Sequence, residues 1–352
     1  MIKKIIKILL VSLFIIALAI LYLSTIGIKT DKFNNQINDN ILKIDKRINL
    51  KLSDVKYLLS PYDLTINIKT SNIQLLLDGR SLSLEEIQTN VALKPLINSQ
   101  FSIDDLQIKT KEIKLNDIIA LVRLFQNSPQ LFILDKITQN GFVKANIDLN
   151  FDENGRIKEN YNIEGSVRKV KLDALNQFKL KNLNFDFNIK KNIYSLKQID
   201  MNLNNIKLTS SLIDIKKRKK LFFINGQFSN EQTNFDIEEF KSIFNNFFNN
   251  MDIQKIVFSS KNIFSFNINK NLKFDNLKVK SAIDLNQLII NKKNLKLKPY
   301  LPNLGKEIKL TQHKIHINFS KDKIDMNGNG KILLNEKADN FSYQIIKNIH
   351  NL

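Results

Sequence analysis

The chain has 352 residues, 43% hydrophobic and 25% charged, with 9 Gly, 5 Pro and no Cys. So much apolar sequence with so little Gly and Pro excludes a disordered, collagen-like or low-complexity protein and is enough for one large or two medium domains. The absence of Cys excludes disulfides, thiolate metal sites and cysteine nucleophiles. The formal net charge of +20 comes from basic residues spread along the whole chain, whereas nucleic-acid-binding proteins concentrate theirs, so we expect no nucleic-acid partner.

An uncharged apolar run of 21 residues, Ile8–Ile28, lies near the N-terminus. At about 1.5 Å per residue it is long enough for a hydrocarbon core of about 30 Å. Lysines at positions 3, 4 and 7 precede it, which predicts a cytoplasmic N-terminus and places everything after Lys29 on the far side. The alternative is a cleavable signal peptide, because Ala17–Ala19 has the small-x-small form. The apolar run continues beyond it, which favours an uncleaved anchor.

We expect a membrane anchor at residues 1–29, a juxtamembrane helix at 30–49 and an extracytoplasmic β domain at 50–352, with a subdivision of that domain near 230–250. The juxtamembrane helix is predicted from an apolar i, i+4 stripe made by Phe33, Ile37, Ile41 and Ile44. No second apolar span follows, so the sequence predicts a single-pass protein.

Alternation of apolar and polar residues dominates the chain after residue 48. Roughly 18 to 22 such runs read as half-buried strands, among them Val143–Phe151, Leu183–Ile189 and Ile315–Phe319. Turn signals separate the runs, for example at Asp78–Gly79, Asn140–Gly141, Asp152–Gly155 and Asn327–Gly330. Because the connections are short, we expect a mostly antiparallel, meandering sheet.

Helical periodicity is confined to a few later segments. Asn116–Phe125 reads as a capped helix of about three turns that ends at Asn127–Pro129. A stripe of aromatic and aliphatic residues, Phe240, Ile243, Phe244, Phe247 and Phe248, predicts another, and the tail Tyr343–Leu352 predicts a last one.

The number of strands constrains the architecture. About 20 strands spaced by about 4.8 Å would give a flat sheet about 90 Å wide, well beyond the roughly ten strands of ordinary open sheets. A few short helices cannot cover its apolar side. The sequence therefore predicts a mainly β protein in which a transmembrane helix precedes a long antiparallel sheet, either curled into a groove or folded into sandwiches.

One segment resembles a known family. Thr89–Ile108, a strand followed by Lys94–Pro95–Leu96–Ile97, a short turn and a second strand, is similar to the segment near the start of AsmA-like proteins. The N-terminal anchor, the helix from Phe33, the early strand pair and the helix start at Leu115–Ile118 follow in the order of that family. The resemblance covers about the first 150 residues, and the rest shares only the repeated β pattern.

The resemblance implies a repeating β-groove, similar to bridge-like lipid transfer proteins, anchored in the bacterial inner membrane with most of the chain in the periplasm. Such a groove holds phospholipid acyl chains and supports lipid transport toward the outer membrane, with outer-membrane or other envelope proteins as further partners. Two departures stand out: the bridging members are much longer, and no segment here resembles their C-terminal region.

Catalytic signals are sparse. Among the three histidines, His313 and His316 are an odd number of residues apart in a predicted strand, so they point to opposite faces and cannot share a metal. We expect these two and His350 at the surface or at strand edges. No G-x-S-x-G, Walker A or H-E-x-x-H motif is present. We therefore expect neither an enzyme nor a cofactor.

Three sets of residues are candidate sites. Two rows predicted to face inward are either protein core or lipid contacts: Phe185, Phe187 and Ile189, and Phe264, Phe266 and Ile268. The basic run Lys216, Lys217, Arg218, Lys219 and Lys220 is either a solvated hairpin tip or a contact for anionic head groups at a membrane surface. The stripe Phe240 to Phe248 is either core or an amphipathic helix that caps the groove.

Two further functions stay open. An assembly factor for outer-membrane proteins would pair its exposed sheet edges with client strands by β-augmentation. An LptC-like lipopolysaccharide-transport component would share the single anchor and the β-groove.

Overall fold

The computed structural model describes most of residues 2–348. The segments outside the described residues are 1, 33, 36–37, 40–46, 54, 78–79, 94–102, 126–127, 153–155, 175–177, 205, 239, 242–251, 270, 272, 292–306, 335–336 and 349–352. Several predicted features fall there: the stripe from Phe33 to Ile44, the turn Asp78–Gly79, the Pro95 part of the family segment, and His350.

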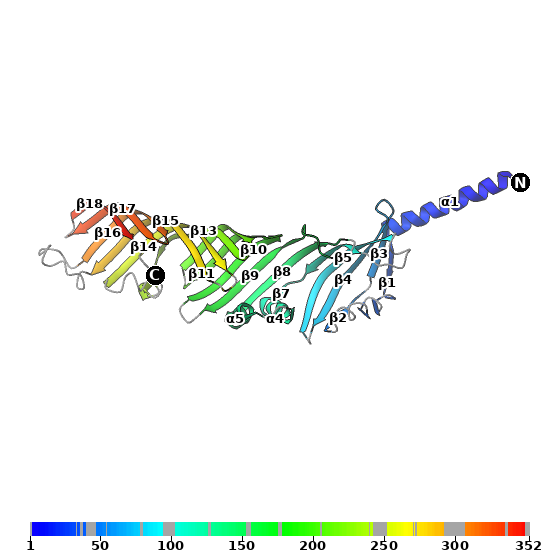
Figure 1. Ribbon diagram of the computed structural model, residues 1–352, viewed down its shortest axis with the longest axis horizontal. Helices are drawn as coiled ribbons and strands as arrows, with labels where there is room; N and C mark the ends of the chain where they lie inside the picture. Colours follow the sequence, from blue (N-terminus) through cyan, green and yellow to red (C-terminus); the bar gives the residue numbers. More distant parts are fainter. Residues whose placement is uncertain are drawn as a thin grey trace. The chain divides into compact units, whose positions relative to one another are not determined.

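The protein is mainly β, with one large antiparallel sheet that is not closed and few helices, which confirms the predicted class (Figure 1). The first nine strands are β1 (Ile28–Thr30), β2 (Ile48–Lys51), β3 (Val55–Ser60), β4 (Thr65–Leu77), β5 (Arg80–Ala92), β6 (Ile103–Thr110), β7 (Ile113–Lys114), β8 (Thr138–Asn150) and β9 (Asn162–Ala174). The other nine are β10 (Phe178–Lys190), β11 (Ile193–Leu203), β12 (Ile206–Arg218), β13 (Leu221–Asn234), β14 (Asp252–Asn269), β15 (Phe274–Asn291), β16 (Glu307–Ser320), β17 (Lys323–Leu334) and β18 (Lys337–Asn348).

The apolar N-terminal segment forms helix α1 (Ile2–Thr25), whose side chains from Leu9 to Tyr22 are exposed. The helix ends at Thr25 and is followed by Gly27, which has a φ of 74° and donates its backbone N–H to the Tyr22 carbonyl oxygen at 3.0 Å. Among the residues that the structure describes, no helix is both long enough and apolar enough to cross a membrane.

Two helices interrupt the strands. Helix α4 (Leu115–Phe125) confirms the predicted helix, whereas α5 (Pro129–Ile137) was not expected because Pro129 was read as a stop signal. The Ser128 hydroxyl accepts the N–H of Leu131 at 3.3 Å, so Ser128 caps α5 and Pro129 occupies its first turn. Arg123 on α4 pairs with Asp135 on α5 at 2.5 Å.

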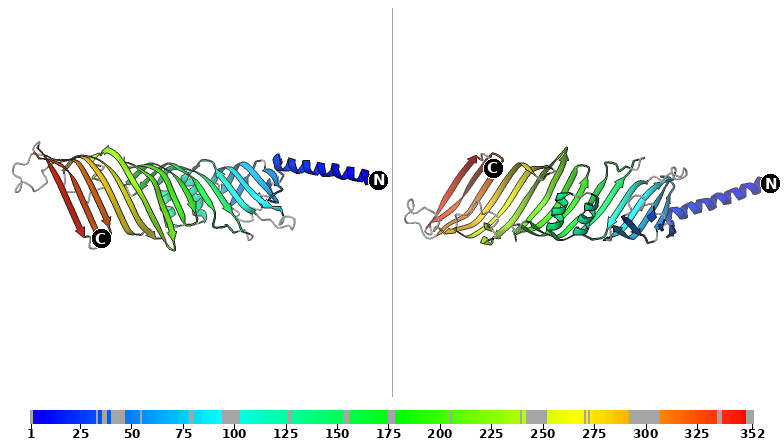
Figure 2. Two further views of the ribbon diagram at one scale, coloured as in Figure 1. Left: turned by 90° about the horizontal axis from the view of Figure 1, so that it is seen from above. Right: turned by 60° about the horizontal axis from the view of Figure 1, so that its bottom comes forward.

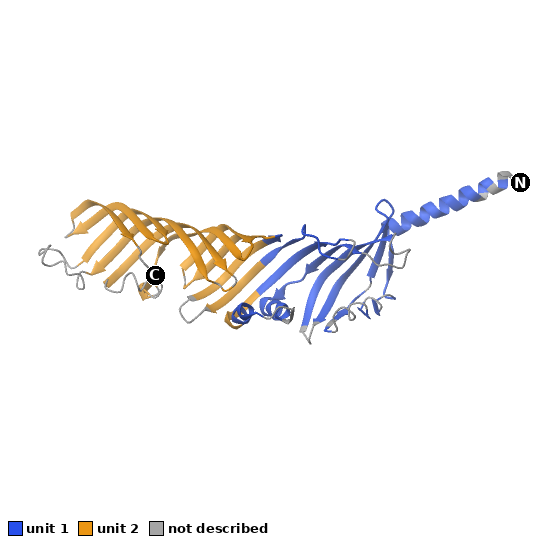
Figure 3. Cartoon of the chain, in the orientation of Figure 1, with its two compact units in different colours: residues 1–135, 142–166, 188–191 blue, residues 136–141, 167–187, 192–352 orange. Residues whose placement is uncertain are grey.

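The chain divides into two compact units (Figure 3). Unit 1 comprises residues 1–135, 142–166 and 188–191, and unit 2 comprises residues 136–141, 167–187 and 192–352. The subdivision expected near residues 230–250 stays a prediction.

Strand β4 organises the sheet of unit 1. One side of β4 pairs with β5, and the other pairs first with β3 and then with β2. Across β4, β5 and β6, the Glu86 carboxylate accepts hydrogen bonds from Lys69 at 2.6 Å and Lys109 at 3.2 Å. The hydrogen bond from Lys69, aided by Lys109, holds the pKa of Glu86 below its ordinary value.

Unit 2 contains a meander from β11 to β18 in which each strand pairs antiparallel with the next (Figure 2). Register shifts interrupt the pairing, for instance between Thr209 and Ile213 on β12 and between Thr311 and Lys314 on β16. Such bulges bend a strand and increase its twist.

Three predictions about turns and ends were wrong. Asn140–Gly141 lies within β8 and Asn327–Gly330 within β17, and the tail expected to be helical from Tyr343 belongs to strand β18. Glycine is tolerated in β17 because aromatic residues lie opposite it: Gly328 faces Tyr343 and Gly330 faces Phe341. Residues 153–155 of the turn predicted at Asp152–Gly155 lie outside the described residues, and Phe151 and Ile157 on its two sides form an antiparallel bridge.

Candidate functional site

One side of unit 2 carries an apolar row that crosses seven strands. The row consists of residues that lie directly opposite one another, one from each strand from β11 to β17: Leu196, Ile213, Gly226, Phe264, Val279, Phe319 and Ile324. Residues paired in this way share one face of an antiparallel sheet. We call the side of β11–β18 that bears this row the apolar face.

The alternation along β16 shows how one-sided the sheet is. Ile315, Ile317 and Phe319 are half-buried on the apolar face, while His316 and Asn318 between them are both exposed on the other side. A second row runs beside the first, because Ile317 lies opposite Met326, which lies opposite Ile345 on β18. This second row is apolar on β16, β17 and β18, and it becomes polar on β15 and β14, because Ile317 also lies opposite Ser281, which lies opposite Asn262.

Four aromatic rings line up on the apolar face near the β14–β15 turn. The ring centroids are 5.5 Å apart for Phe228 and Phe264, 5.9 Å for Phe264 and Phe266, and 5.4 Å for Phe266 and Phe274. Phe274, the first residue of β15, is 67% exposed. We call these four residues the phenylalanine ladder; it leads from the middle of the face to solvent.

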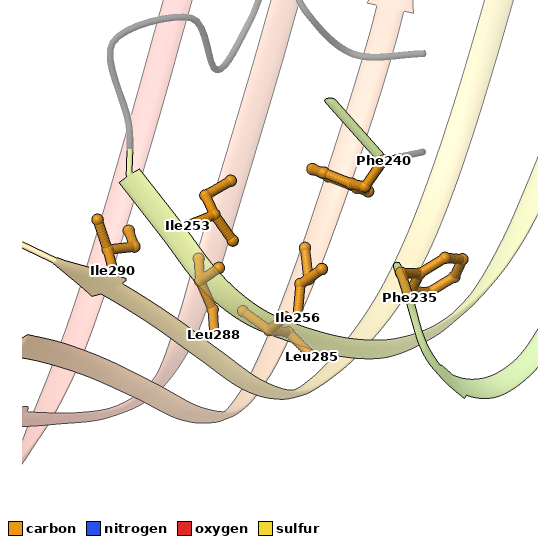
Figure 4. Packing of buried hydrophobic residues seen from close by; sticks show 7 residues of the cluster. All are labelled: Phe235, Phe240, Ile253, Ile256, Leu285, Leu288 and Ile290. Atoms are coloured by element: carbon orange, nitrogen blue, oxygen red, sulfur yellow. The ribbon is translucent and has the colours of Figure 1, made fainter. Parts of the chain in front are cut away.

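The opposite ends of β14 and β15 are densely packed (Figure 4). A packed cluster of buried residues lies there: Phe235, Phe240, Ile253, Ile256, Leu285, Leu288 and Ile290. The Phe235 N–H donates to the Ile256 carbonyl oxygen at 3.1 Å, and the Phe235 ring stacks on Phe258 with centroids 4.3 Å apart. The segment that follows β13 thus covers this end of the sheet.

Of the two predicted inward rows, one lies on the apolar face. Phe264, Phe266 and Ile268 are all half-buried there, since Phe266 lies opposite Ile224 and Ile268 opposite Phe222. The other row, Phe185, Phe187 and Ile189 on β10, is also half-buried. None of the described ring contacts brings the two rows together.

The predicted basic run forms the β12–β13 hairpin. Lys216, Lys217 and Arg218 end β12, Lys219 and Lys220 make the turn, and all five are exposed. Lys219 adopts a φ of 54°, and the Arg218 guanidinium carbon lies 5.4 Å from the centre of the Phe223 ring. Lys217 lies opposite Phe222, so the run meets one end of the apolar face.

The predicted capping stripe is described at one position. Phe240 is 4% exposed and belongs to the packed cluster, with its ring centroid 6.3 Å from those of Phe235 and Phe258. Ile243, Phe244, Phe247 and Phe248 lie outside the described residues.

The surface position expected for His313 was wrong. Its side chain is 1% exposed and lies on the apolar face beside Gly330, with its Nε2 3.1 Å from the Lys331 carbonyl oxygen. His313 is on this face because it is two residues before Ile315 in the alternation, and it lies opposite Leu285, a member of the packed cluster. His316 is exposed on the other face, as predicted.

Within the described part of the chain, no group of three His, Asp or Glu side chains is placed to hold a metal ion. The sequence analysis missed Phe228 and Phe274 as members of the site. Their contacts with Phe264 and Phe266 follow from the register of neighbouring strands, which a sequence pattern does not specify. Comparison with known protein families, curated proteins and solved structures finds no match to the chain.

Proposed function

We propose that this protein binds phospholipid acyl chains on the apolar face of unit 2 and supports lipid transport from the bacterial inner membrane toward the outer membrane. The observation that carries the proposal is the incomplete burial of the phenylalanine ladder, which ends in a phenylalanine that is 67% exposed. Contiguous apolar side chains that are left exposed on a folded domain are typical of a binding surface. Acyl chains would remove it from water at about 25 cal/mol per Å².

The contrast with the packed cluster strengthens this proposal. The same two strands, β14 and β15, are covered by Phe235 and Phe240 at one end and bear half-buried rings at the other. These two strands therefore form a tightly packed core where the segment after β13 contacts them. We infer that the end of β14 and β15 that bears the phenylalanine ladder binds a ligand.

Attachment to the membrane is the second element of the proposal. The run Ile8–Ile28 has the length and flanking charges of an anchor, and the exposed apolar side chains of α1, from Leu9 to Tyr22, have no described protein layer over them. This arrangement would keep the bulk of the chain in the periplasm beside its lipid source.

A pair of photo-crosslinking residues on β16 tests lipid binding in the full-length protein. A photoreactive amino acid replaces Ile317 on the apolar face in one variant and His316 on the opposite face in the other. After irradiation in bacterial envelopes, mass spectrometry should find phospholipid adducts for position 317 and few for position 316. Equal yields at both positions, or protein adducts alone at 317, would contradict the proposal.

A second candidate function rests on β18. Its described pairing is with β17, and every residue of β18 except Tyr343 is exposed, including Phe341 and Ile345. An edge strand of this kind can add a client strand by β-augmentation. Crosslinkers on β18 that capture unfolded outer-membrane protein, with no lipid captured at position 317, would favour assembly of such proteins over lipid transport.

A further inference from the structure

The turns at one end of the unit 2 strands form a basic rim. It comprises Lys216–Lys220 in the β12–β13 hairpin, Lys273 before β15, and Lys321 and Lys323 at the β16–β17 turn. Register puts the first two turns at the same end, because Leu221 lies opposite both Arg218 and Asn269. Lys321 Nζ lies 3.9 Å from an Asp275 carboxylate oxygen, so the third turn lies beside the second.

Positive charge dominates this rim. The described residues of the three turns and their flanks carry eight cationic side chains and three carboxylates, Asp275, Asp322 and Asp325. Two of these carboxylates are partly neutralised by ion pairs, Asp275 with Lys321 and Asp325 with Lys323 at 3.5 Å. The five residues Lys216–Lys220 are exposed and follow one another without an acidic residue.

The basic rim and the phenylalanine ladder meet. Phe274, the exposed end of the ladder, follows Lys273 directly in the chain. Ile268, which lies opposite Phe274, also lies opposite Phe222, the neighbour of Leu221 at the β12–β13 turn. An apolar path that opens to solvent at Phe274 therefore begins among cationic side chains.

We propose that the rim selects the lipid: an anionic phospholipid is held with its acyl chain along the phenylalanine ladder and its phosphate among the lysines of the basic rim. This inference rests on the proposed function and adds the head-group class to it. A lysine ammonium is a point charge that attracts any phosphate, but a zwitterionic head group carries its own ammonium beside the phosphate. Several lysines together therefore favour a head group with net negative charge.

The test compares two photoreactive lipids that share the same diazirine-bearing acyl chain and differ in head group, phosphatidylglycerol and phosphatidylcholine. Full-length protein is irradiated with each lipid, and adducts on residues 264–274 are quantified by mass spectrometry. We expect roughly a tenfold higher yield with phosphatidylglycerol. Equal yields from the two lipids would overturn the inference and leave the proposed function standing, whereas no adduct from either lipid would overturn the proposed function.

Two variants with the same change in net charge locate the selectivity. The rim variant replaces Lys216, Lys217, Arg218, Lys219 and Lys220 with Gln, and the control variant makes the same replacement at five exposed lysines that lie away from the rim, Lys197, Lys207, Lys255, Lys261 and Lys314. We expect the ratio of the adduct yield with phosphatidylglycerol to the adduct yield with phosphatidylcholine to fall to about one in the rim variant. In the control variant this ratio should stay near ten.

The yield with phosphatidylcholine serves as the folding check, because an intact apolar face should label equally in all three proteins. A rim variant that keeps the wild-type ratio would overturn the inference. The inference would also fail if this variant lost attachment to phosphatidylglycerol vesicles but kept the ratio, because the rim would then contact a membrane surface rather than the head group of a held lipid.

Discussion

The two ends of β14 differ in how their apolar residues are covered. At one end Ile253 and Ile256 are buried in the packed cluster together with Phe235 and Phe240 (Figure 4). At the other end of the same strand, Phe264, Phe266 and Ile268 are half-buried. Apolar alternation in a strand therefore specifies that a face will be apolar, and a separate segment determines whether it becomes a core or a binding surface.

Identical substitutions at the two ends provide the strongest test of this contrast. Ile253→Ala removes a side chain that is 2% exposed and should lower the free energy of unfolding by about 3 kcal/mol, because a cavity remains. Ile268→Ala, at the half-buried end of the same strand, should cost about 1 kcal/mol and reduce lipid adducts. Urea titrations followed by circular dichroism measure both values. Equal costs would show that the open end is as well packed as the cluster.

Two glycines on the apolar face extend the comparison to backbone packing. A Cβ at Gly330 would lie 2.6 Å from the Cα of His313, whereas one at Gly226 would lie 2.8 Å from side-chain atoms of Ile213 and Phe264 that can move. We expect Gly330→Ala to cost about 2 kcal/mol and Gly226→Ala about 1 kcal/mol. Thermal unfolding of the two variants checks the order, and a larger loss for Gly226→Ala would contradict it.

Glu86 on β5 provides a reference in unit 1, whereas β14 belongs to unit 2. Because Lys69 and Lys109 lower its pKa in the folded state, its stabilisation is present above the ordinary value of 4.5 and is lost as the pH falls through the folded-state pKa. Glu86→Gln should therefore cost about 1 kcal/mol at pH 7 and less near pH 4, which is below the ordinary pKa of the carboxyl group. Urea titrations at both pH values test this. A cost that is independent of pH would assign the effect to packing.

Much of the fold follows from the sequence because its signals are local. Alternation identified the strand at Ile315–Phe319 and the inward row at Phe264–Ile268, and the capped apolar stripe identified the helix at Asn116–Phe125. Each of these depends on residues within a few helical turns or one strand. The opposite faces of His313 and His316 followed from the same period of two.

The errors occurred where residues distant in sequence decide the outcome. Gly328 and Gly330 read as turn residues, and cross-strand aromatic residues keep them in β17. His313 is buried on the apolar face opposite Leu285 of β15, although a polar residue in a strand reads as exposed. Pro129 was interpreted as the end of the preceding helix, because proline is common both just after a helix and in the first turn of the next one. The phenylalanine ladder required the register of three strands, which no single segment contains.

The meander from β11 to β18 also has a consequence for how the protein is made. Since each of these strands pairs with its neighbours in sequence, each newly synthesised strand can form hydrogen bonds with the strand that precedes it in the chain. Contacts that are close in sequence form quickly. The sheet of unit 2 can therefore grow in the order of synthesis, one hairpin at a time, without waiting for a later part of the chain.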